Sequence, residues 1–255
     1  MRRIALIGAT GLDWLQDPRK REFVDQTAPS GYSIVSYMPR YGTHSVESLV
    51  DEAYNAPYIL EQVVRASKDR VDAILIDCAC DPALDAAREV TEIPVVGMLR
   101  SALHIALTLG RTFGIITLQG ESLVRCFEHR VRAEGMAQFC RAVEFFQMPV
   151  LDIAKYPERA QSELLKSCKD LVEKHRADVV VLGCTGLSHY IDLDELMRHS
   201  GAPVIDPYLA GLWTAVTYVE MGVAHSRVAY PPPPKKEITE PDVLTGSFDD
   251  ILKCD

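Results

Sequence analysis

Val179-Val180-Val181-Leu182-Gly183-Cys184-Thr185-Gly186 is the stretch of sequence on which the fold depends most. Four apolar residues in a row are typical of a strand that is buried on both faces, as in a parallel sheet. Glycines then flank a thiol in a tight turn, where the backbone can approach a ligand closely. An earlier stretch has the same pattern, Ala73-Ile74-Leu75-Ile76-Asp77-Cys78. We therefore interpret the two cysteines as partners that face each other across one pocket.

Both stretches belong to a repeat that runs through the chain. Residues 2–7 match residues 111–116 at an offset of 109, residues 70–78 match residues 176–184 at 106, and residues 93–95 match residues 202–204 at 109. Three matches in the same order with a nearly constant offset predict two similar α/β units. Equivalent strand ends would then bring both cysteines to one cleft between the units, and such clefts bind ligands in α/β proteins.

Apolar runs and helical periodicity alternate along the rest of the chain. Strands are predicted at 4–7, 32–38, 71–76, 93–97, 113–117, 143–148, 178–182 and 203–205. Helices are predicted to begin at residue 45 and again at Pro57, and to cover 82–91, 101–109, 121–133, 157–175, 192–198 and 210–221. Asp81 followed by Pro82 is the usual start signal for the helix at 82–91. The alternation predicts an α/β fold of two pseudosymmetric domains with mainly parallel sheets and the active site in the inter-domain cleft.

We expect the first domain to comprise residues 1–98 and 208–223, and the second to comprise residues 99–207. A proline-led extension over 224–255 should follow, because four consecutive prolines favour a polyproline II spacer.

Composition and charge exclude several classes of protein. With 47% hydrophobic and 25% charged residues, the chain resembles ordinary soluble globular proteins. Its net charge of −9 disfavours binding to nucleic acid or to an anionic membrane. We find neither a signal peptide nor an apolar run of about 20 residues. Seven scattered cysteines favour reduced thiols in a cytoplasmic protein.

The loop after the first strand, Gly8-Ala9-Thr10-Gly11, is half of a glycine-rich phosphate motif. Neither a complete GxGxxG pattern nor a Walker lysine is present, which disfavours nucleotide binding. A metal site made by Cys78, Cys80 and Cys184 is disfavoured too, because a C-x-C spacing is tighter than usual for zinc and no histidine partner is evident. We therefore expect neither a cofactor nor a metal.

Thiols suit proton transfer, because their ordinary pKa of about 8.5 is easily moved toward neutrality. If one thiolate removes a proton from a carbon acid, the thiol opposite can return a proton to the other face and so invert the stereocentre. Backbone N–H groups in the two loops would stabilise the enolate-like intermediate. Cys78 and Cys184 are thus the candidate catalytic residues.

Further candidates surround the two cysteines. The predicted substrate-binding residues are Thr10, Ala79, Thr117, Gly183, Thr185 and Gly186. For the threonines, local capping and turn hydrogen bonds are the competing interpretation. Cys80 is interpreted as structural, although it competes with Cys78 for the same role. The other cysteines, Cys126, Cys140, Cys168 and Cys254, lack a comparable context and are interpreted as structural or surface thiols.

The segment Cys78-Ala-Cys-Asp81-Pro82-Ala-Leu84, with Ile93-Pro94-Val95-Val96-Gly97 after it and Gly183-Cys184-Thr185-Gly186-Leu187 later, resembles the aspartate/glutamate/hydantoin racemase superfamily. The likeness is closest to the hydantoin and allantoin racemase branch and covers about residues 30 to 221. It implies a cofactor-independent two-base racemase or epimerase acting on a hydantoin, allantoin or related ureide, with Cys78 and Cys184 as the two bases. A pseudosymmetric pair of domains and a homo-oligomer are also implied.

Departures from the family pattern concern the substrate. The family usually has an Asn-Pro-Asn-Thr-like loop where this chain has residues 8–11, and Ala83 and Leu99-Arg100 also differ from the branch. Alternatives on the same scaffold are a maleate-type cis-trans isomerase, in which one cysteine acts as nucleophile, and an arylmalonate-type decarboxylase, which keeps only one of the two cysteines. A ligand-binding member without turnover is a third alternative.

Overall fold

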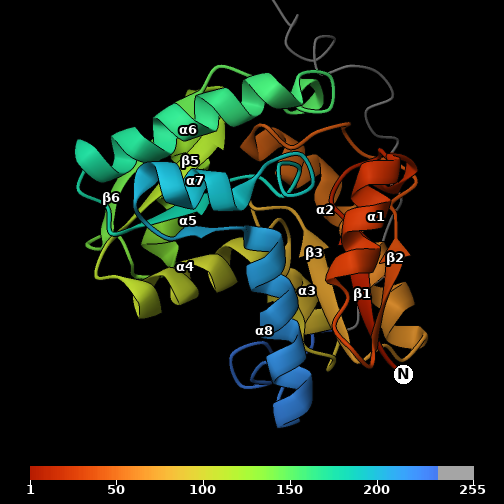
Figure 1. Cartoon of the computed structure of the whole chain (residues 1–255). Helices are drawn as coiled ribbons and strands as arrows, with labels where there is room; N and C mark the ends of the chain where they lie inside the picture. Colours follow the sequence, from red (N-terminus) through yellow and green to blue (C-terminus); the bar gives the residue numbers. More distant parts are fainter. Residues whose placement is uncertain (235–255) are drawn as a thin grey trace, which may run out of the picture.

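The computed structural model of the chain describes residues 1–234, and its two halves each contain a four-stranded sheet. The strands are β1 (Arg2–Gly8), β2 (Tyr32–Tyr37), β3 (Ala73–Asp77) and β4 (Val95–Gly97), then β5 (Phe113–Leu118), β6 (Cys140–Phe146), β7 (Val179–Leu182) and β8 (Val204–Ile205). The first sheet has the order β2-β1-β3-β4 and the second the order β6-β5-β7-β8, with every pair parallel (Figure 1). The predicted α/β fold with repeated parallel sheets is confirmed.

Helices cover both faces of each sheet, which explains why the strands are continuous apolar runs. The helices are α1 (Pro18–Thr27), α2 (Leu49–Lys68), α3 (Leu84–Val90), α4 (Met98–Leu109), α5 (Glu121–Ala133), α6 (Pro157–Glu173), α7 (Leu193–Ser200) and α8 (Pro207–Met221). In β1, Ala5 and Ile7 pack with residues of α2 and α3, whereas Ile4 and Leu6 pack with residues of α1 and α8. In the second sheet, α6 and α7 cover one face, and α4 and α5 cover the other.

One core cluster joins the two halves. It contains Ala79 and Cys80 from the loop after β3, Leu103 from α4, and Phe113 and Phe127 from the second half. Helix α4 follows β4 directly, leads into β5 and also packs against α8 (Figure 1). The loop after β3 and the second sheet are therefore held in one continuous packed body.

Several helices differ from the sequence-based expectation. Ser48 caps α2, which continues through Pro57 instead of restarting there, because burial of Ile59 and Val63 on one face outweighs the cost of about 3 kcal/mol for an internal proline. Helix α1 was not predicted at all, although Asp17 caps it and Pro18 occupies its first turn. Helix α4 begins at Met98 rather than at residue 101.

Asp81 does not cap the helix that follows it, so that prediction was wrong. Asp81 and Ala83 adopt left-handed backbone conformations with φ of 48° and 56°, and α3 starts only at Leu84. The Asp81 carboxylate instead accepts hydrogen bonds from the backbone N–H groups of Leu99 and Arg100, at 3.0 and 2.8 Å. It therefore caps the first turn of α4 and ties that helix to the loop after β3.

The domain boundaries stay a prediction. Helix α8 does pack on β3 and β4 of the first sheet, as that prediction requires. Of the expected extension, residues 224–234 are described, and the Arg227 guanidinium donates to the carbonyl groups of Arg88, Glu89 and Thr91. Residues 235–255, including Cys254, lie outside the described part. Within residues 1–234, every helix is too short or too polar to cross a bilayer.

Candidate active site

A small cavity lies where the carboxyl ends of the central strands of the two sheets meet. Its lining includes the predicted residues Thr10, Cys78, Ala79, Gly183, Cys184, Thr185 and Gly186. The volume is about 50 Å³, which suits a small molecule rather than a polymer. The structure thus brings both candidate thiols, which lie 106 residues apart in sequence, to one cavity.

Cys78 follows β3 directly and is partly exposed. Its sulfur accepts a hydrogen bond from the backbone N–H of Cys80 at 3.4 Å. A backbone N–H in this position can donate to negative charge that develops on the sulfur. Cys78 therefore has the local support that a proton-abstracting base requires.

Cys184 lies in the turn after β7, in a different electrostatic setting. Burial raises the pKa of its thiol to about 12, and the N–H of Gly186 opposes that rise only in part. A Cβ on Gly186 would lie 3.3 Å from the Cys184 sulfur, so the glycine leaves room for the thiol. The structure thus keeps the Cys184 thiol protonated near neutral pH.

Lys20 and Asp77 form a buried ion pair that sequence reasoning missed. Both side chains line the cavity and are at most 6% exposed, and the Lys20 ammonium donates to Asp77 Oδ2. Lys20 comes from α1, whose start signal Asp17-Pro18 was the one available clue to a helix in this place. Asp77 is the last residue of β3 and directly precedes Cys78. The pair places a positive charge beside the thiols.

The three predicted threonines are placed differently. Thr10 Oγ1 donates to the carbonyl of Leu12 and accepts from Trp14 Nε1, so it stabilises its own turn. Thr117 is fully buried behind the cavity, where its hydroxyl lies 3.5 Å from the carbonyl of Gly183. Thr185 lines the cavity, and its hydroxyl makes no hydrogen bond within residues 1–234. Thr185 is the threonine that has a hydroxyl available to a ligand.

His189 lies close to the site but is poorly suited to act as a base. Burial lowers the pKa of its imidazole to about 4, and the charge of Lys20 lowers it further. Both ring nitrogens are buried and lack a hydrogen-bond partner among the described residues. A neutral ring in this position packs against Phe23 and Tyr190.

Cys80 and Cys126 are buried close to the site. Cys80 lines the cavity next to Cys78, and hydrogen bonds to the thiols of Cys126 and Cys78, together with burial, raise its pKa well above the usual value. The Cys126 thiol donates to Glu52 Oε1 at 2.7 Å. This contact was not predictable from the sequence, because α2 and α5 belong to opposite halves of the chain.

The chain matches the family model described as "Asp/Glu/Hydantoin racemase" over residues 20–215. It is 35% identical to a hydantoin racemase of Pseudomonas sp. (strain NS671) over 211 residues, which cover 82% of this chain and 84% of the relative. Identity to a hydantoin racemase of Rhizobium meliloti is 37% over 190 residues, covering 73% and 78%. An allantoin racemase from Klebsiella pneumoniae superposes with a TM-score of 0.85 at 27% identity, covering 94% of this chain and 97% of that one.

Proposed function

Because the chain belongs to the Asp/Glu/hydantoin racemase family, we propose that it racemises a small ureide, a 5-substituted hydantoin or allantoin, by proton transfer between Cys78 and Cys184. The names of the relatives support the substrate class. The observation that carries the proposal is that both thiols line one small cavity, each at the end of an equivalent strand.

In the proposed reaction, the Cys78 thiolate takes the proton from the stereocentre, and the electron pair moves onto the adjacent carbonyl to give an enolate. The Cys184 thiol then delivers its proton to the opposite face of the same carbon. Its raised pKa supports this assignment, because the thiol must hold a proton in the resting protein. Proton exchange with solvent restores the starting forms of both sulfurs.

Two further groups support an enolate in this cavity. The Lys20 ammonium and the Thr185 hydroxyl both line the space and can donate to an oxygen that gains negative charge. Fixed donors of this kind are worth several kcal/mol at the transition state, because they need little reorganisation in an enclosed site. We propose that they hold the carbonyl next to the stereocentre.

The test is proton exchange at the stereocentre in D₂O, followed by NMR and polarimetry over a panel of 5-substituted hydantoins, allantoin and acidic amino acids. We expect Cys78→Ser and Cys184→Ser to lose racemisation by a factor of at least about 100, the usual contribution of one general acid or base. Each single variant should still exchange solvent deuterium into one enantiomer only.

Cys140→Ser is the matched control, because Cys140 lies in β6 and does not line the cavity. Racemisation at the wild-type rate by both single variants would contradict the two-thiol mechanism. A covalent cysteine–substrate adduct in mass spectra would instead favour a maleate-type isomerase.

The resemblance also supports a homo-oligomer, and the scattered reduced thiols support a cytoplasmic protein. Light scattering of the purified protein tests the first of these, since a monomer mass would exclude it.

A further inference from the structure

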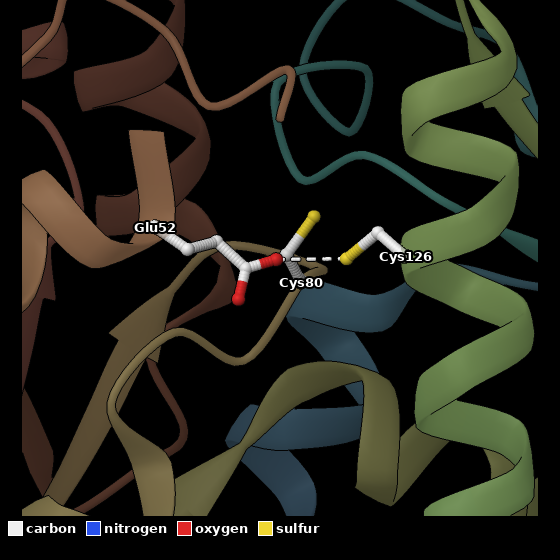
Figure 2. A group of neighbouring side chains, drawn as sticks. All are labelled: Glu52, Cys80 and Cys126. Carbon is white, nitrogen blue, oxygen red and sulfur yellow. Dashed lines mark hydrogen bonds between the residues drawn. The ribbon is translucent and has the colours of Figure 1, made fainter. Parts of the chain in front are cut away.

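Three metal-ligating side chains meet beside the cavity, and the proposed reaction uses none of them. Glu52 comes from α2, Cys80 from the loop after β3 and Cys126 from α5, and Figure 2 shows their functional groups turned toward one another. All three residues are buried, with exposures of 8%, 3% and 1%. Their ligand atoms all lie within 4.8 Å of one another.

The geometry of this cluster is close to that of a zinc site. Tetrahedral zinc with Zn–S bonds of about 2.3 Å holds two sulfur ligands about 3.8 Å apart. Because the ligand atoms lie within 4.8 Å of one another, each pair needs to approach by at most about 1 Å to reach such separations. The tight C-x-C spacing, which disfavoured a site made by Cys78, Cys80 and Cys184, is no obstacle, because these three ligands come from three separate elements.

We propose that Glu52, Cys80 and Cys126 form a binding site for a thiophilic divalent cation, Zn²⁺ or an ion of similar chemistry, next to the thiol of Cys78. Two thiolates and one carboxylate are donors that such an ion prefers, and a water molecule completes the tetrahedron.

The charge balance of the cluster permits binding. Arg130 pairs with Glu52 Oε2, which leaves Oε1 to the Cys126 thiol in the free protein and to the ion in the complex. Binding of one Zn²⁺ displaces the two thiol protons, which pass to solvent, so the net charge of the cluster does not change.

An ion reaches the cluster through the cavity, which Cys80 and Leu123 both line. The bound ion fixes the position of Cys80, whose backbone N–H donates a hydrogen bond to the Cys78 sulfur. Binding of the ion should therefore change the rate of racemisation. This consequence rests on the proposed function, whereas the site itself does not.

The experiment uses Co²⁺ as a spectroscopic probe on the reduced full-length protein, with Zn²⁺ as competitor and no substrate present. We expect thiolate-to-cobalt charge-transfer absorption that saturates at one ion per chain and disappears on addition of Zn²⁺. The absorption should persist in the Cys78→Ser/Cys184→Ser double variant. It should be lost in Cys126→Ser and in Cys80→Ser, with a fall in affinity of at least about 100-fold.

Glu52→Gln gives an independent check if a cysteine variant fails to fold, since it keeps both thiols and weakens binding. Cys168 lies on the buried face of α6, so Cys168→Ser is the matched control and should bind as the wild type does. Absence of charge-transfer bands in the wild type would overturn the proposal. Bands that persist in Cys126→Ser but vanish in the Cys78→Ser/Cys184→Ser variant would also overturn the proposal, because Cys78 and Cys184 would then hold the ion. A protein that binds Co²⁺ in this way but fails to racemise would contradict the proposed function alone.

Discussion

Lys20 and Asp77 place a full positive and a full negative charge where water is largely excluded. A buried ion pair of this kind is a poor stabiliser, because both charges lose their hydration, but removal of one partner leaves the other unpaired. The pair is therefore better explained by the reaction than by the fold.

Substitution of Lys20 separates these two roles. Lys20→Met should lower the free energy of unfolding by about 3–5 kcal/mol, since the Asp77 carboxylate loses its partner. The double variant Lys20→Met/Asp77→Asn should regain most of that stability, because no buried charge remains, yet its kcat should stay at least about 100-fold low. Urea unfolding and polarimetry measure the two effects. A wild-type kcat in the double variant would exclude a role for Lys20 in the reaction.

The thiol of Cys184 should resist alkylation in the folded protein. With its pKa raised to about 12 by burial, about one molecule in ten thousand carries the thiolate at pH 8. Peptide mapping after brief treatment with iodoacetamide should find Cys184 unmodified, whereas the same peptide from urea-unfolded protein should react fully. Rapid modification of Cys184 in the folded protein would contradict the assignment of its thiol as the acid.

Residues tied to strand ends were predictable from the sequence, and residues brought in by packing were not. Cys78 and Cys184 each follow a buried apolar run, so their meeting follows from the repeat. Lys20 reaches the cavity on a helix that was not predicted, and Cys126 meets Glu52 only because α5 packs across the boundary between the halves. Contacts of this second kind leave no local pattern.

At the scale of elements, the loop after β3 is fixed by Asp81 and not by the helix that follows it. Gly97 is required there, because a Cβ in its place would lie 2.5 Å from Asp81 Oδ2. The sequence signal Asp-Pro did mark a capping residue, but the wrong helix was assigned to it. Two residues with positive φ turn the chain back, and the hydrogen bonds that the Asp81 carboxylate accepts from α4 offset their strain.

Asp81→Asn tests this link. The asparagine amide replaces one acceptor oxygen with a donor, so one of the N–H groups of Leu99 and Arg100 loses its partner inside the protein. We expect a loss of about 1–3 kcal/mol in the free energy of unfolding and a lower kcat, because the loop that carries Cys78 is no longer held. Thermal unfolding and racemisation assays measure both. Asp85→Asn, in the exposed first turn of α3, is the control and should change neither.

At the scale of the whole molecule, buried thiols make the fold sensitive to alkali. Burial raises the pKa of Cys140 to about 11 and those of Cys168 and Cys184 to about 12. The unfolded chain therefore loses thiol protons at lower pH than the folded chain does. Stability from these groups is fully present below about pH 9 and is lost as the pH rises toward the folded values.

The free energy of unfolding should fall between pH 9 and pH 11 by up to about 1.4 kcal/mol per pH unit for each such thiol. Urea unfolding under reducing conditions at several pH values measures the slope. Cys168→Ala should be less stable at pH 7 but should show a shallower decline. An equal slope in that variant would mean that Cys168 ionises in the folded state as readily as in the unfolded chain.

The architecture of the whole molecule was the most predictable level, because the repeat offsets of 109, 106 and 109 specify both sheets at once. The exact ends of some elements were not predictable from the sequence. The start of α4 is one of them, because its capping side chain, Asp81, lies 17 residues before the first residue of the helix.

The identical strand orders of the two sheets also indicate how the chain evolved. One gene copied and fused to itself gives two halves of this kind, and its ancestor would have been a short chain that paired with a second copy of itself. In such an ancestor, the same cysteine of two identical chains would contact opposite faces of the substrate, so neither enantiomer would be favoured. The ability to act on both enantiomers would then be older than the fused chain. The different surroundings of the Cys78 and Cys184 thiols would have arisen after the fusion.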